Sequence, residues 1–254
     1  MTVRAARPQT HLGRAIRAIW PHAQPTARRE HHAQANWLRD VILGGQDGLV
    51  NILGIILGVH AGGGSTTVLV ATGLAAAITE SISMGAVGYT SSLAERDYYH
   101  AAQETEEAEI AATPDLERQE VREIYAAKGF SGELLDRVVE TITANRTTWI
   151  ATMMTEELQL RPVSTADILR TSIVITVATL IGHLIPLMPF IWFPGGAALI
   201  AAIGASAVVL FGVGVYSAVT LVGDWRTSGV KMVVIGLGAA ALGYLVGRLF
   251  NSVA

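Results

Sequence analysis

The segment ITESISMGAVGYTSSLAERD, from Ile78 to Asp97, begins as an apolar helix and ends in charged residues. Glu80 and Met84 lie one helical turn apart, inside the part of the segment that suits lipid. An ionised carboxylate costs several kcal/mol in a bilayer, so such a residue normally faces a partner or an internal path. The segment therefore predicts a helix that leaves the membrane and carries functional polar residues inside it.

The composition of the whole chain agrees with a membrane protein. Hydrophobic residues make up 51% of the 254 residues and charged residues 15%, and the mean hydropathy is +0.42. The segment Glu95–Arg161 holds 15 of the 21 Asp and Glu residues but 7 Lys and Arg residues, so the acidic charge is concentrated in one insert. Cysteine is absent, which leaves carboxylates, thioethers and imidazoles as metal ligands.

Five segments are long enough to cross ~30 Å of hydrocarbon, which takes about 20 helical residues. Stretches rich in Gly or Pro separate them, and they are Val41–His60, Thr66–Ser92, Ala166–Leu187, Phe193–Leu221 and Gly229–Phe250. The sequence therefore predicts an all-α membrane protein of five transmembrane helices, with a cytosolic three-helix metal-binding insert between spans 2 and 3.

The distribution of positive charge predicts the orientation of these spans. The cytosolic side receives the N-terminus, the insert and the loop with Arg226 and Lys231, while the C-terminus lies outside. We divide the chain into a flexible basic arm (1–35), spans 1 and 2 (36–93), the acidic insert (94–163) and spans 3 to 5 (164–254). The arm lacks the apolar core of a secretory signal. A basic segment beside a span is expected from this topology and from anionic lipid, so no nucleic-acid partner is predicted.

Small residues at four-residue spacing predict close packing between spans. Such rows occur at Gly54/Gly58, at Gly204/Val208/Gly212 and at Gly243/Gly247. We interpret all three rows as packing surfaces and assign them no other role.

Asp47 lies about two turns into the first span, and Asn51 follows one turn later on the same face. Each of these residues also has a structural alternative. Asp47 could be a helix-start or interfacial residue, and Glu80 could make a structural hydrogen bond between helices. Met84 could simply be a packing residue. Carboxylates beside a thioether favour Fe2+, Mn2+, Co2+ or Zn2+ over Mg2+ and Ca2+. Acids that exchange a bound metal for a proton are the chemistry of a proton-coupled metal transporter.

The insert is predicted to begin where the second span continues out of the membrane without a breaker. Pro114 suits the start of a second helix and Gly129 its end. A third helix is expected over SGELLDRVVETITANRTTWIATMMTEELQL, with Ser131 as its N-cap and Pro162 beyond its end.

Two E-x-x-E pairs and a later Met-Met-x-x-Glu pattern are the candidate metal ligands of the insert. Residues three apart share a helix face, so the pairs can converge on one ion. An ordinary solvated face fits the glutamates equally, and the bundle core fits the methionines. Di-iron oxidases usually carry E-x-x-H, which is absent, so this class is disfavoured. The candidates are Glu106, Glu109, Glu117, Glu120, Met153, Met154 and Glu157.

The order DGLVNILGIILG, SISMGAV, an acidic insert ending in TTWIATMMTEELQL and three further spans resembles the vacuolar iron transporter family, over about Asn36 to Phe250. The resemblance implies a homodimer, not an enzyme, that moves Fe2+ out of the cytosol in exchange for protons. The path would run between subunits, in a vacuolar-type or prokaryotic cytoplasmic membrane. The family's path residues match Asp47 and Met84, and its cytosolic ligands match Glu106, Glu109, Glu117, Glu120, Glu157, Met153 and Met154.

One position departs from the plant-type pattern of this family. Gly88 stands where those members carry Glu one turn after the path methionine, and Glu80 lies one turn before it. We therefore expect Glu80 to replace that acid at a different depth, as a metal residue beside Asp47 and Met84. A membrane-anchored iron buffer or sensor without transport is the alternative function. The histidines receive no role, although His60 and His183 at the outer ends of spans could relay protons or simply meet water.

Overall fold

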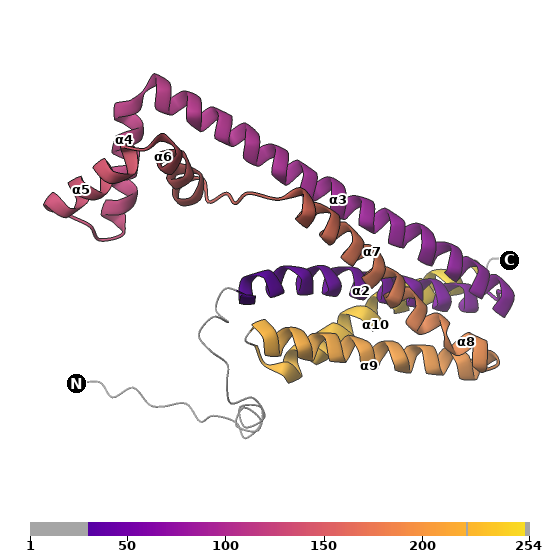
Figure 1. Ribbon diagram of the computed structural model, residues 1–254. Coiled ribbons are helices and arrows are strands. Elements are labelled where there is room, and N and C mark those ends of the chain that lie inside the picture. The colour runs from indigo at the N-terminus through magenta and orange to yellow at the C-terminus, as the bar shows by residue number, and fades with distance from the viewer. Residues whose placement is uncertain (1–29, 222, 252–254) are drawn as a thin grey trace, which may run out of the picture. The chain divides into compact units, whose positions relative to one another are not determined.

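The computed structural model describes residues 30–221 and 223–251, and every regular element in this part of the chain is a helix (Figure 1). Five of these helices are long and apolar enough to cross a membrane, which confirms the all-helical class and the predicted spans. The five are α2 (Glu30–Ala61), α3 (Thr66–Ala112), α7 (Thr165–Leu187), α9 (Gly195–Leu221) and α10 (Trp225–Asn251). A short helix, α8 (Pro189–Trp192), follows α7.

Most of the predicted basic arm lies outside the described residues, which begin with α2 at Glu30. Residues 30–35, which we assigned to the basic arm, form the start of α2. Asp40 to Ala254 form one compact unit, to which the contacts described below belong.

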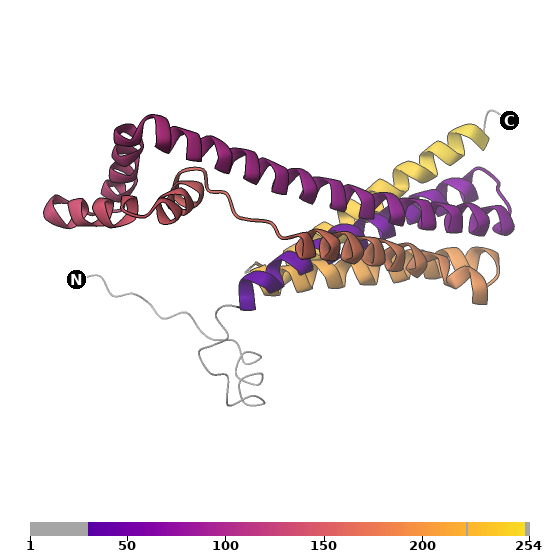
Figure 2. The same ribbon diagram turned by 45° about the horizontal axis from the view of Figure 1, so that its top comes forward.

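Helix α3 is much longer than a membrane is thick. Its 47 residues extend about 70 Å at 1.5 Å per residue, more than twice the ~30 Å hydrocarbon core. Figures 1 and 2 show it as one uninterrupted helix with α7 beside its first half. It ends at Ala112, before Pro114 starts α4 (Pro114–Ala127). The helix therefore continues beyond its apolar part as the sequence predicts.

The remainder of the insert contains more helical segments than expected. The predicted third helix is divided into α5 (Gly132–Thr143), α6 (Arg146–Thr152) and a π-helix, η2 (Met153–Glu157). The break occurs at Asn145, whose side chain accepts a hydrogen bond from the backbone N–H of Thr148 and so caps α6. Asparagine competes with the helix backbone in this way and favours a new helix start. Gly129, with φ of +97°, ends α4 as predicted.

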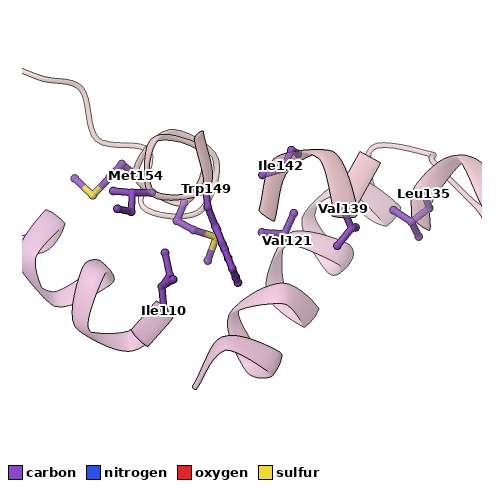
Figure 3. Close-up of a cluster of buried hydrophobic side chains, with 9 residues drawn as sticks. Ile110, Val121, Leu135, Val139, Ile142, Trp149 and Met154 are labelled. Carbon is purple, nitrogen blue, oxygen red and sulfur yellow. The ribbon is translucent and has the colours of Figure 1, made fainter. Parts of the chain in front are cut away.

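A compact apolar core joins these segments to the end of α3 (Figure 3). Each helix contributes one face, and the nine buried members are Ile110, Val121, Leu135, Val139, Ile142, Trp149, Ile150, Met153 and Met154. Burial of this many large side chains fixes η2 against α3 and α4.

Two of the three predicted small-residue rows pack against each other. A Cβ placed on Gly243 would lie 2.4 Å from the carbonyl oxygen of Gly54, and one on Gly247 would lie 2.0 Å from that of Gly58. Helices α2 and α10 therefore approach closely, as expected. The third row finds no such contact within the described chain, because nothing lies within 4 Å of a Cβ at Gly204 or Gly212.

Glycines also bring α7 against α2 and α3. A Cβ on Gly48 would lie 2.4 Å from the carbonyl oxygen of Thr179, and one on Gly182 would lie 2.3 Å from that of Gly45. Between α3 and α7, the hydroxyl of Ser172 donates to the carbonyl of Gly85 at 2.8 Å. These approaches place the polar side chains of three spans within reach of one another.

Candidate functional site

A cavity of about 680 Å³ runs along α2 and α10, beside their packed glycines. Its walls are mostly small or apolar, and the two polar side chains that line it are Asp47 and Asn51. Asp47 is exposed to this space. The structure therefore bears out the expectation that Asp47 and Asn51 share a face, and it opens that face to a volume larger than an ion.

Glu80 of α3 is held by side chains from two other helices. Its Oε1 accepts a hydrogen bond from Nδ2 of Asn51 on α2. Its Oε2 lies 2.9 Å from Nε2 of His183 on α7, and its side chain is 20% exposed. Asn51 thus links the cavity that contains Asp47 to the carboxylate of Glu80.

His183 is the functional candidate to which the sequence analysis gave no role. The alternative that it simply meets water at the outer end of a span is wrong, because the side chain is 0% exposed. Its Nδ1 lies 2.7 Å from the carbonyl oxygen of Thr179. One signal was available in the sequence: between Arg170 and Leu187, His183 is the one ionisable side chain in an apolar stretch.

Met84 lies half-buried on α3, one turn after Glu80. Gly88, one turn further along, packs against α7, where a Cβ would lie 2.8 Å from Cδ1 of Ile175. A side chain at this position must displace Ile175, which explains in packing terms why glycine suits it. The acidic residue one helical turn from Met84 on α3 is therefore Glu80 rather than a residue at position 88.

In the insert, the first member of each E-x-x-E pair is buried and the second is more exposed. Glu106 is 3% exposed and Glu117 is 4% exposed, so a solvated face is wrong for these two. Glu109 is exposed and Glu120 is half-buried. The pairs therefore turn one glutamate each toward the interior of the insert.

The buried carboxyls repel one another and favour their protonated forms. Burial, followed by the charges of Glu117 and Glu157, raises the pKa of Glu106 to about 8. A hydrogen bond with Glu117 contributes in the same direction, and Oε1 of Glu106 has no hydrogen-bond partner. Burial and the charge of Glu120 likewise raise the pKa of Glu117. Glu106 lies 14 residues beyond the apolar segment that ends at Ser92, so this environment is outside the bilayer.

The π-helix supplies the third wall of this cluster. Met153 and Met154 are buried in the apolar core, so the predicted core packing is correct (Figure 3). Glu157 is exposed, and burial of its carboxyl together with the charges of Glu120 and Glu109 raises its pKa. π-Helices often occur at functional sites because they place neighbouring side chains differently from an α-helix.

A family model described as the VIT family matches residues 38–248, which covers all the site residues named above. The chain belongs to the VIT family. Members of this family are transporters rather than enzymes. The predicted resemblance is therefore confirmed, and the chain is an integral membrane protein of this family.

Named relatives in the VIT family align over most of the chain. A "Vacuolar iron transporter 1" of Tulipa gesneriana is 28% identical over 225 residues, which cover 88% of this chain and 91% of the relative. Another of Arabidopsis thaliana is 30% identical over 187 residues, covering 72% and 74%. A "Vacuolar iron transporter" of Centaurea cyanus is 32% identical over 167 residues, covering 65% and 68%.

The structure of this VIT family member brings the predicted site residues into two groups. In the spans, Asp47 and Asn51 line one cavity, and Asn51 donates a hydrogen bond to Glu80. In the insert, the five glutamates interact electrostatically. The groups are far apart, since Glu80 and Glu106 are separated by about 39 Å along α3 at 1.5 Å per residue. Among the described residues, no three acidic or histidine side chains are gathered closely enough to hold one ion.

Proposed function

We propose that this chain is an antiporter that moves a divalent transition metal, foremost Fe2+, out of the cytosol in exchange for protons. The observation that carries the proposal is Asp47, an acid inside an apolar span that faces a cavity and lies beside the Asn51–Glu80–His183 hydrogen bonds. An acid at this depth is compatible with lipid when a cation neutralises it. The names of the relatives support iron as the cargo, with Mn2+, Co2+ or Zn2+ as further candidates.

Asp47 and Met84 are the proposed metal residues of the spans. We do not propose Glu80 as a metal ligand, because both of its oxygens already make hydrogen bonds, with Asn51 and His183. We give Glu80 a separate role beside the metal path.

The insert is proposed to lie in the cytosol and to collect metal for the path. Glu106, Glu109, Glu117, Glu120 and Glu157 supply oxygen, and Met153 and Met154 supply sulfur, a combination suited to transition metals. The unpaired Oε1 of Glu106 and the raised pKa values indicate carboxyls that lack cationic partners among the described residues. Binding requires Glu109, Glu120 and Glu157 to turn inward, which their partial exposure permits.

A homodimer is part of the proposal because the cavity along α2 and α10 is open and mostly apolar. Val246 and Phe250 line it and are 56% and 70% exposed. A second copy placed on this face would enclose the cavity and form a path between subunits.

Flux into proteoliposomes tests the function. Protein reconstituted with and without a proton gradient should take up Fe2+ or Co2+ faster with the gradient. Asp47→Ala should abolish this uptake, while the matched control Asp97→Ala, an exposed acid on the part of α3 outside the apolar segment, should retain it. The proposal would be refuted by metal uptake that does not depend on the proton gradient and that persists in the double variant Asp47→Ala, Glu80→Ala.

A non-transporting metal buffer is the second candidate, favoured by the position of the glutamate cluster outside the spans. In that case deletion of the insert should remove every metal effect, and Asp47→Ala should remain fully active in cells. Loss of activity in Asp47→Ala decides for transport.

A further inference from the structure

We infer that Glu80 and His183 together form a proton-binding site in the membrane, and that this site holds the proton exchanged for metal. The inference rests on the proposed antiport function and assigns its proton to two residues on different spans. It starts from the hydrogen-bond geometry of His183, a side chain with no contact with water.

The contact of His183 with Thr179 determines which ring nitrogen carries a proton. Nδ1 lies 2.7 Å from the carbonyl oxygen of Thr179, and a carbonyl can only accept a hydrogen bond. Nδ1 therefore donates. In a neutral imidazole the other nitrogen, Nε2, then has a lone pair and no hydrogen.

The contact of His183 with Glu80 requires one more proton. Nε2 lies 2.9 Å from Oε2 of Glu80, and neither a lone pair nor a carboxylate oxygen can donate. One proton must therefore lie between them, either on Oε2 as a carboxyl or on Nε2 as an imidazolium. Both forms are neutral as a pair, which suits an environment of low dielectric.

Asn51 leaves no ambiguity about which oxygen shares this proton. Its Nδ2 donates to Oε1 of Glu80, so Oε1 is an acceptor and Oε2 faces the histidine. The helices that surround the pair are α2, α3 and α7. Asp47 of α2 interacts electrostatically with both members of the pair.

Asp47 provides the link between metal and proton. A divalent cation bound at Asp47 adds positive charge near the pair and favours release of the shared proton to water. The pair then carries one negative charge, which attracts the cation. When the cation leaves, the charge left on Glu80 takes up one proton again. One proton is thus released for each cation bound, without any direct bond between the metal and Glu80.

The test uses Glu80→Gln, which keeps the hydrogen bonds and removes the exchangeable proton. The glutamine oxygen can accept from Asn51 and its amide can donate to Nε2 of His183. In proteoliposomes, we expect Glu80→Gln and His183→Gln to lose the acceleration of metal flux by a proton gradient, together with proton counterflow. The matched control is His60→Gln, an exposed histidine at the end of α2, which should behave as the wild type.

The outcomes separate this inference from the function beneath it. Absence of metal flux in the wild type refutes the antiporter itself. Coupled flux in the wild type that persists in both variants overturns the assignment of the proton to Glu80 and His183, and leaves the antiporter in place. Loss of coupling in both variants supports the assignment.

If a variant is misfolded or shows no metal flux, infrared spectroscopy can test whether metal displaces the shared proton. Full-length protein with Glu106→Gln and Glu117→Gln, reconstituted in lipid, lacks the buried carboxyls of the insert. A protonated-carboxyl or imidazolium band that disappears when Co2+ is added supports a shared proton displaced by metal. Bands that do not respond to Co2+ overturn it.

Discussion

Glu80 and Glu106 lie on the same helix, and their surroundings differ in the partners that the protein provides. Glu80, inside the apolar half of α3, receives an amide from Asn51 and an imidazole from His183. Glu106, in the half beyond the apolar segment, is buried among other glutamates and has an oxygen without a hydrogen bond. A carboxylate in lipid needs a fixed partner or a cavity that admits a cation, whereas one near water can take a proton or a metal ion directly from solution.

The two regions are therefore suited to different tasks. Side chains from two other spans hold the carboxyl group of Glu80 in a fixed position. In the insert, carboxyls compete with one another, so their charge depends on the pH and on dissolved cations. In our proposal, the collection of metal and its exchange for a proton are thereby separated along one helix.

The largest expected effect is the dependence of metal binding by the insert on pH. The pKa of Glu106 is about 8, so below this value a cation must displace its proton. Affinity for Co2+ should rise about tenfold per pH unit well below the pKa of Glu106, or roughly 50-fold between pH 6 and pH 8. Calorimetry on the full chain in detergent measures this, and Glu106→Gln should flatten the profile. The exposed neighbour Glu104→Gln should leave it unchanged.

The same pKa predicts the opposite trend for the metal-free insert. The pKa of Glu106 lies above its ordinary value of 4.5, so its contribution to folding is complete below pH 4.5 and is lost as the pH rises through about 8. Thermal unfolding without metal should therefore become easier over this range, and less so in Glu106→Gln. Stability that rises toward pH 8 would show that Glu106 is ionised at neutral pH.

Packing of the spans gives the next largest effect. Gly247→Ala places a methyl group against the backbone of Gly58 and should destabilise the protein by about 1–3 kcal/mol. Gly204→Ala is the matched control, because nothing lies within 4 Å of its Cβ and alanine is the better helix former. Melting temperatures in detergent compare the two. Equal melting temperatures would contradict the close approach of α2 and α10.

Removal of the amide partner makes Glu80 more like Glu106. Asn51→Ala should cost about 1 kcal/mol, because hydrogen bonds between membrane helices are worth about this much. The control is Gln103→Ala, on the half of α3 beyond the apolar segment. This variant loses a 3.1 Å hydrogen bond to Glu107 and should lower the free energy of unfolding by less. A similar loss in both variants, measured by thermal unfolding, would remove the distinction between the two halves of α3.

The smallest expected change in stability comes from Met154→Leu. Leucine has a similar volume, so the apolar core should lose less than about 1 kcal/mol. If the thioether binds metal as proposed, Co2+ affinity nevertheless falls. Ile150→Leu, in the same core, is the control for packing alone. Unchanged affinity in Met154→Leu would limit Met154 to the core.

Local patterns in the sequence predicted the features that depend on neighbours along the chain. The five spans, the continuous exit of α3, the start of α4 at Pro114 and its end at Gly129 follow from hydropathy and from the backbone preferences of Pro and Gly. The third helix of the insert was wrong, because the capping bond of Asn145 outweighed the helical pattern around it.

Among the site residues, the face shared by Asp47 and Asn51 was readable because helical spacing sets it. The burial of Glu106 and Glu117 could not be predicted from the sequence, because the E-x-x-E pattern is the same on a solvated helix face and on a buried one. All three small-residue rows were predicted to be packing surfaces. Two of them pack against each other, whereas no atom of the described chain lies within 4 Å of a Cβ at Gly204 or Gly212.

The amino-acid sequence by itself determined that this chain is a five-span helical membrane protein with acidic side chains in lipid and in one insert. Hydropathy and helix signals act over a few residues, and they suffice for this. Tertiary structure alone decided that Glu80 meets His183, 103 positions away, and that the insert's glutamates surround one another. Such contacts depend on which helix faces pack together, and the close approach of glycines such as Gly48 sets that packing in three dimensions.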